Sequence, residues 1–303
     1  PPPPHHLAIG SDIGLCVLQY SQVPRNMPQF PRNNPKEPTK KENDPTNINK
    51  INIEMDKSLY GHPYVKSPID MACWDIIGKY YKAPIWQLFG GKYGKTISLY
   101  RAISQEDPGQ MKESVNHYKI EGYQKFQLKV GGHYQEDIER IKQVDSILND
   151  SNILVADANT GWKTHEALKV IDKTCHLNIY YEQPCETYNE CLLIREKNNQ
   201  PFILDESIFS LNSFLTAYKD NAMDIINLKI SKLGCLTKSK QIRDLCVELN
   251  IPMTIEDSWG GDIATAAISH LAHSTPEDYR FSSTDFNSYN SISYSEGSPQ
   301  RIN

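Results

Sequence analysis

The chain has 303 residues, enough for one large barrel or two modest domains with a sizeable core. A formal net charge of −5 gives no electrostatic reason to expect nucleic acid or an anionic membrane as partner, and no apolar run is long enough for a transmembrane helix. The seven cysteines are irregularly spaced without a zinc-type motif, which favours reduced thiols and a cytoplasmic location.

The first 90 residues differ in character from the rest. Residues 1–50 are rich in Pro, Asn and Lys and predict a loop, with one short strand expected within residues 7–20. Helical apolar spacing begins at Ile51. A second helix is predicted with Ser67 as N-cap, Pro68 in the first turn and Pro84 as its stop. Its predicted apolar face consists of Ile69, Cys73, Ile76, Ile77 and Tyr80.

From residue 91 to about 290, strand-like and helix-like segments alternate at a spacing of about 25 residues. The predicted strands are 97–103, 125–130, 153–159, 179–184, 202–207, 225–230, 252–257 and 280–286. The predicted helices between them are 107–121, 134–149, 164–174, 187–197, 210–219, 236–249 and 262–273. This α/β alternation predicts a (β/α)8-type (TIM) barrel. The main alternative is a doubly wound open sheet, but no Gly-rich dinucleotide-binding motif follows any of the predicted strands. Residues 291–303 are expected to form an irregular tail without an eighth helix.

Three acids stand at the ends of three successive predicted strands, namely Asp157, Glu182 and Asp205. The carboxyl ends of barrel strands meet at one mouth, so these side chains are expected to converge. Three carboxylates with no His or Cys partner suit a hard cation, Mg²⁺ or Mn²⁺ in its place.

A lysine stands one strand before these acids and another one strand after them, Lys129 and Lys229. A cation at the acids would stabilise the charge formed when a proton α to a carboxylate is removed, and a base must remove that proton. Lysine can serve if burial and the metal charge lower its pKa toward neutrality. Lys232 has the opposite strand parity to Lys229 and is predicted to be a surface group.

Eight motifs between about residues 43 and 290 resemble the mandelate racemase and muconate-lactonising branch of the enolase superfamily. They are SPIDMACWDIIGK, PIWQLFGGK, FQLKVGG, VADANTGW, YYEQP, LDES, NLKISKLGC and IEDSWGGD. The resemblance implies a barrel with an N-terminal α+β capping domain, of which residues 1–90 are a truncated, irregular remnant. It implies magnesium held by Asp157, Glu182 and Asp205, with Lys129 and Lys229 as the proton-transferring pair.

Further motifs, including GHPYVKSPIDMACWDI, LYRAISQ and TIEDSWGGDIATAAISHLAHST, resemble the group of cis-3-hydroxy-L-proline dehydratases. That group implies a small amino-acid substrate, loss of water to give a cyclic imine, and assembly into a homo-oligomer. Asp257 and Trp259 would hold the substrate ammonium, and Gln127 and Asn159 would also bind substrate. Gln127 replaces the first lysine of the usual Lys-x-Lys pair.

Two alternatives stay open. A pair of lysines on opposite faces of an α-carbon also suits a racemase or epimerase of proline-type amino acids or betaines. The second alternative is an inactive, degenerate relative that keeps the metal site, because the expected capping domain is too short to close over the mouth of the barrel.

Overall fold

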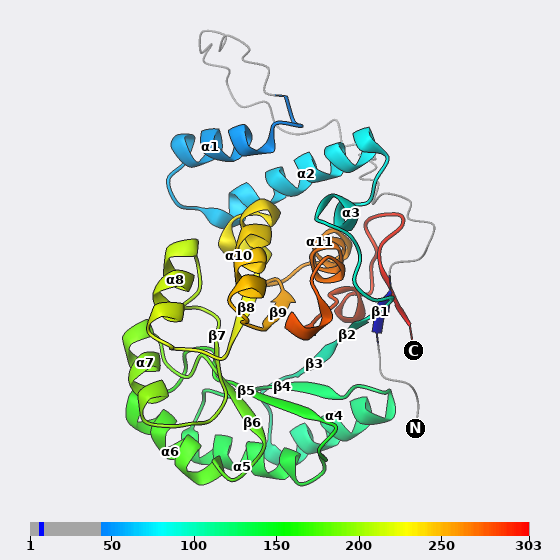
Figure 1. Cartoon of the computed structure of the whole chain (residues 1–303). Helices are drawn as coiled ribbons and strands as arrows, with labels where there is room; N and C mark the ends of the chain where they lie inside the picture. Colours follow the sequence, from blue (N-terminus) through cyan, green and yellow to red (C-terminus); the bar gives the residue numbers. More distant parts are fainter. Residues whose placement is uncertain (1–5, 9–43, 303) are drawn as a thin grey trace, which may run out of the picture.

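The computed structural model describes residues 6–8 and 44–302 of the chain (Figure 1). Two long N-terminal helices, α1 (Ile48–Ser58) and α2 (Pro63–Tyr81), lie together at one end of the molecule, followed by the short α3 (Ile85–Leu88). The Asn47 side chain caps α1 by accepting a hydrogen bond from the Lys50 N–H at 3.4 Å.

Helix α2 begins a turn earlier than predicted. Its first residue is Pro63, whose fixed φ suits that position, and the chain enters through left-handed Gly61 and His62. Ser67 is therefore not an N-cap but a buried residue inside the helix, and Pro68 is also internal. Both predictions were wrong because packing against the barrel fixes where this helix starts.

The predicted apolar face of α2 was also wrong in part. Cys73 and Ile77 are buried, whereas Ile69, Ile76 and Tyr80 are 48%, 43% and 70% exposed. The buried face instead contains polar Lys66, Ser67 and Asp70. Lys66 and Asp70 are hydrogen-bonded to residues of α1, which apolar periodicity alone does not reveal. The Ser67 hydroxyl has no hydrogen-bond partner within the described residues.

The predicted barrel is confirmed: eight parallel strands pair in chain order, with no pairing between the first and the last, so the barrel is nearly closed. They are β3 (Tyr100–Ile103), β4 (Lys125–Lys129), β5 (Ile153–Asp157), β6 (Ile179–Glu182), β7 (Phe202–Leu204), β8 (Ile225–Lys229), β9 (Met253–Glu256) and β10 (Arg280–Ser283). The helices that follow them are α4 (Pro108–Ile120), α5 (Tyr134–Asp145), α6 (Thr164–Thr174), α7 (Tyr188–Glu196), α8 (Leu211–Lys219), α9 (Ile230–Leu233), α10 (Leu236–Glu248) and α11 (Asp262–His273). Among these barrel strands and helices, α9, a single turn before α10, has no counterpart in the prediction.

A second, three-stranded antiparallel sheet joins distant parts of the chain. Strand β1 (His6–Ala8) lies between β2 (Ile97–Ser98) and β11 (Gln300–Ile302). β11 lies within the tail that was predicted to be irregular. A strand forms there because β1, nearly 300 residues away in the sequence, supplies its hydrogen bonds. The short strand expected within residues 7–20 overlaps β1, and the rest of that range lies outside the described residues. Among the described residues after β10, only a 3-10 turn (Asn287–Tyr289) and β11 follow, with no eighth helix.

Alternation along the strands separates the core from the barrel interior. Phe126, Leu128 and Ala156 are buried in the main apolar core between strands and helices. Gln127 and Lys129 have the opposite parity and share a face. In the strand register Lys129 lies beside Asp157, and Asp157 lies beside Glu182. The parallel register thus places these three side chains at one level of the mouth. Within the described residues, no helix is long and apolar enough to cross a membrane.

Candidate active site

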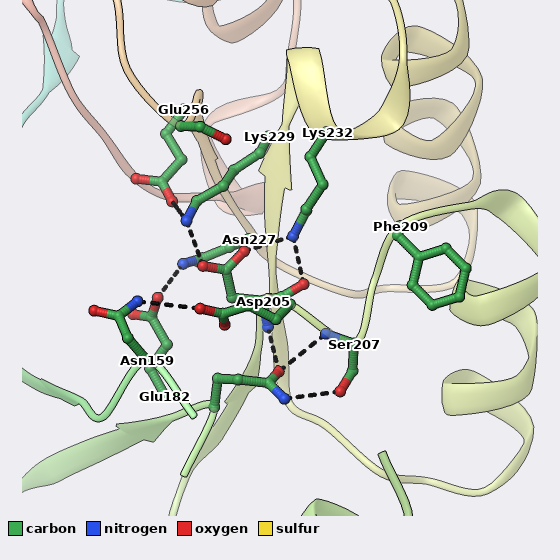
Figure 2. A network of polar contacts seen from close by, with 12 residues as sticks. Asn159, Glu182, Asp205, Ser207, Phe209, Asn227, Lys229, Lys232 and Glu256 are labelled. Carbon is green, nitrogen blue, oxygen red and sulfur yellow. Dashed lines mark hydrogen bonds and ion pairs between the residues drawn. The ribbon is translucent and has the colours of Figure 1, made fainter. Parts of the chain in front are cut away.

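Acidic side chains gather at the carboxyl ends of the strands, as predicted. Carboxylate oxygens of Glu182, Asp205 and Glu256 lie within 4.8 Å of one another, and all three residues are buried (Figure 2). Asp157 is equally buried beside Glu182, but its Oδ2 is paired with Lys129 Nζ at 2.5 Å. The structure therefore brings Glu182 and Asp205 together with Glu256, which was not predicted, and places Asp157 beside Glu182 in the strand register.

Glu256 was missed by the sequence interpretation. It ends β9 in register with Lys229, and we had assigned function to Asp257, the next residue. The available signal was strand parity, since an acid at the last position of a barrel strand shares the level of its neighbours. The Tyr100 hydroxyl donates to Glu256 Oε2, so β3 also contributes to the site.

Lys129 and Lys229 both point into this cluster. Lys229 Nζ donates to Asp205 Oδ2 and lies 3.6 Å from Glu256 Oε1. Burial alone would lower the pKa of each lysine, but the surrounding carboxylates outweigh it and raise both pKa values above 10.5. We had expected a lowered lysine pKa; with the protein's own groups alone the shift has the opposite direction.

Lys232 is not the surface group that we predicted. It is 9% exposed, and its Nζ donates to the Asp205 main-chain oxygen and to Asp205 Oδ1, the latter at 2.5 Å. Figure 2 shows Lys229 and Lys232 approaching Asp205 together. Strand parity failed because β8 ends at Lys229 and the short helix α9 turns Lys232 back toward the mouth. Burial raises the pKa of Asp205, but Lys232 and Lys229 outweigh this effect and hold it below its usual 3.8.

Two amides hold the Glu182 carboxylate. Gln127 Nε2 donates to both Glu182 oxygens at 3.2 and 3.0 Å, and Asn227 Nδ2 donates to Oε1. Burial, followed by repulsion from Asp157 and Asp205, raises the pKa of Glu182 well above 4.5. The amide nitrogen of Gln127, which we predicted to bind substrate, is therefore engaged by the Glu182 carboxylate.

The other predicted substrate-binding residues have different surroundings. Asn159 donates from Nδ2 to Glu206 Oε1 at 3.2 Å. Asp257 is 3% exposed and accepts hydrogen bonds from the Ser231 N–H and hydroxyl and from the Ser258 N–H. Trp259 is 64% exposed, beside the Phe286 ring at 5.6 Å. Asp257 thus supports the β8–α9 turn, while Trp259 remains accessible to a ligand.

The donor set fits a hard divalent cation. Four carboxylates, those of Asp157, Glu182, Asp205 and Glu256, face three lysine ammoniums, and the cluster is buried. The buried oxygens Glu256 Oε1 and Asn227 Oδ1 accept no hydrogen bond within the described structure. An all-oxygen set with unsatisfied acceptors is the chemistry that Mg²⁺ or Mn²⁺ prefers.

Two family models match the chain. One described as "Enolase C-terminal domain-like" matches residues 110–301, and "Mandelate racemase / muconate lactonizing enzyme, N-terminal domain" matches residues 41–90. The chain belongs to the mandelate racemase/muconate lactonizing enzyme family of the enolase superfamily. The resemblance stated from the motifs is confirmed.

Curated relatives and solved structures agree with this assignment. The chain is 54% identical over 257 residues to a cis-3-hydroxy-L-proline dehydratase of Roseibium aggregatum, covering 85% of this chain and 70% of that protein. It is 32% identical over 232 residues to an N-succinyl-L-Arg/Lys racemase of Bacillus cereus, covering 75% and 63%. An enolase-superfamily structure from Roseovarius nubinhibens complexed with magnesium superposes with a TM-score of 0.78 at 35% identity, covering 82% of this chain and 68% of that one.

Proposed function

We propose that the protein is a Mg²⁺-dependent hydro-lyase that dehydrates cis-3-hydroxy-L-proline to a cyclic imine. One observation carries the proposal: Lys129 and Lys229 flank a buried carboxylate cluster in a chain 54% identical to a dehydratase of that substrate. The N-succinyl-L-Arg/Lys racemase of Bacillus cereus and an L-Ala-D/L-Glu epimerase of Clostridium acetobutylicum are more distant, at 32% and 29% identity.

Asp157, Glu182 and Asp205 would hold the cation, with Glu256 beside them. When bound, Mg²⁺ would offset the negative charge that develops on the substrate carboxylate as the α-proton leaves. Gln127 and Asn227 fix the Glu182 carboxylate. These side chains define where the substrate carboxylate sits and so direct its α-carbon toward a lysine.

The two lysines would divide the proton transfers. One neutral lysine accepts the α-proton, and the other, protonated, donates to the 3-hydroxyl, which leaves as water with its bonding electrons. The electrons of the broken C–H bond form the Cα=C3 double bond of an enamine, which tautomerises to the imine. In a cis-3-hydroxy acid the α-hydrogen and the hydroxyl lie on opposite ring faces. Lysines on β4 and β8, on either side of the acid-bearing strands, suit this geometry.

A lysine acts as a base only when neutral, and the protein's own carboxylates favour the charged form of both. Lys129 must therefore loosen its pairing with Asp157, or Lys229 its pairing with Asp205, before either accepts a proton. Asp205 would remain paired with Lys232 if Lys229 moved away.

The experiment is incubation of the protein with Mg²⁺ and a panel of cis and trans 3- and 4-hydroxyprolines in D₂O. We expect the cis-3 isomer to lose one water, and mass spectrometry of the products measures this loss. Lys129→Met and Lys229→Met should each lower turnover at least about 100-fold, whereas Lys240→Met, on the outer helix α10, should not. Unchanged turnover in both lysine variants would refute the mechanism.

Epimerisation is the second candidate, favoured by the same placement of two lysines. It predicts solvent deuterium at the α-carbon with the hydroxyl retained and the configuration inverted. Detection of that product would refute the dehydratase proposal in favour of an epimerase. A chain that binds the ion but yields neither product would match the inactive alternative.

We also propose a cytoplasmic location and a homo-oligomer. All six cysteines of the described region are free, which suits a reducing compartment. Light scattering after size exclusion measures the assembly state, and a monomer mass would overturn the oligomer proposal.

A further inference from the structure

Gln183 occupies the position immediately after Glu182 and has an unfavourable backbone conformation. Its φ is +35°, within the left-handed region that a residue with a Cβ rarely adopts, and it is fully buried. Such a conformation persists only where surrounding contacts enforce it, and it marks positions with a specific task.

All of the polar capacity of the Gln183 amide is used. Its Oε1 accepts from the main-chain N–H groups of Asp205 and Ser207 at 3.1 and 3.2 Å. Its Nε2 donates to the Ser207 hydroxyl at 2.8 Å and to the Cys185 carbonyl at 3.1 Å, with Cys191 Sγ at 3.5 Å. Figure 2 shows Ser207 below Asp205. One side chain therefore fixes the turn that presents Asp205.

The main chain of Gln183 extends the connection to both neighbouring strands. Its N–H donates to the Ile203 carbonyl on β7 at 3.0 Å, and its carbonyl accepts from the Thr160 N–H, just after β5, at 2.9 Å. Gln183 thus joins the ends of β5, β6 and β7, which carry Asp157, Glu182 and Asp205.

We propose that Gln183 is a positioning residue that sets the spacing of these three carboxylates for a divalent cation without contacting the ion. The inference rests on the metal centre of the proposed function. The amide is required because the site presents two N–H donors on one side and a carbonyl acceptor on the other. A carboxylate at this position would place a second oxygen against the Cys185 carbonyl, and an apolar side chain would leave two buried N–H groups without a partner.

The test measures Mn²⁺ binding to the purified full chain by electron paramagnetic resonance of the free ion. Gln183→Met and Gln183→Glu should each raise the Mn²⁺ Kd at least about tenfold, as is typical for residues that orient metal ligands. Gln200→Met is the matched control, because the half-buried Gln200 donates to the Cys175 carbonyl at the other end of the strands. Met111→Ala, a buried substitution on α4, controls for lost stability and should leave the Kd within about twofold.

A Kd unchanged in both Gln183 variants would overturn the inference while leaving the metal centre intact. Wild-type protein that binds no Mn²⁺ would overturn the metal centre and the inference together. If both Gln183 variants fail to fold, Ser207→Ala removes one bond of the same network and should still raise the Kd about threefold. No rise in Ser207→Ala would then count against the positioning role.

Discussion

Replacing Lys232 with Met tests the most unexpected contact of the site. The substitution keeps most of the length of the side chain but removes the Lys232 donor from Asp205 Oδ1. The Asp205 main-chain carbonyl loses the same donor but still accepts from the Ile208 N–H at 2.9 Å. Removing one partner of a buried ion pair costs about 3 to 5 kcal/mol. Lys229 still pairs with Asp205 Oδ2, so we expect the lower end, about 3 kcal/mol, or roughly a 5 °C fall in Tm for a protein of this size.

The assay is urea unfolding in EDTA, followed by tryptophan fluorescence. Lys240→Met provides the comparison, because its i,i+4 pair with Asp244 is partly exposed to solvent and worth at most about 1 kcal/mol. Equal loss of unfolding free energy in the two variants would refute the reasoning and restore Lys232 to the surface role first predicted. Because Mg²⁺ would supply positive charge beside Asp205, the ion should stabilise Lys232→Met more than the wild type.

Three further predictions concern pH, helix packing and the cation. Burial lowers the pKa of Lys125 from 10.5 to about 8, so the folded state binds this proton more weakly than the unfolded state. Its destabilising effect is complete below pH 8 and fades up to 10.5; relative to Lys125→Met, wild-type stability should rise by about 2 kcal/mol from pH 7 to 10 in urea titrations. Asp70 accepts from Asn52 on α1 and from the Thr237 N–H and hydroxyl at the start of α10; Asp70→Ala should therefore lose about 3 kcal/mol in urea unfolding. Mg²⁺ at 100 times its Kd should stabilise the wild type by about 2.7 kcal/mol in thermal scans, and Asp205→Asn should largely abolish this gain.

Each of these has a contradicting result. A pH-independent difference between wild type and Lys125→Met would show that the lysine keeps its ordinary pKa. A loss below about 1 kcal/mol in Asp70→Ala would mean that its hydrogen bonds are replaced by water. An equal Mg²⁺ effect in Asp205→Asn would place the ion elsewhere.

The barrel was predictable because its strands and helices are local patterns. Each predicted strand from residue 125 onward coincides with a strand of the structure to within about three residues at either end, and alternation placed Asp157 and Glu182 at strand ends. The predictions failed mainly at elements whose bounds depend on contacts between segments distant in the sequence. The start of α2 depends on its packing against the barrel, and β11 exists only through its partner β1.

The sequence by itself determined the order of the elements, the family and the convergence of acids and lysines. Each of these follows from hydrophobic periodicity, strand length or motifs that short segments of the sequence contain. Only the tertiary structure decided the partners of those groups. Lys232 enters the site through a single helical turn, Glu256 through its register with Lys229, and Gln183 through bonds to three strand ends. A charge pair or hydrogen bond between strands depends on angles and register set by the whole barrel, so no local stretch of sequence contains it.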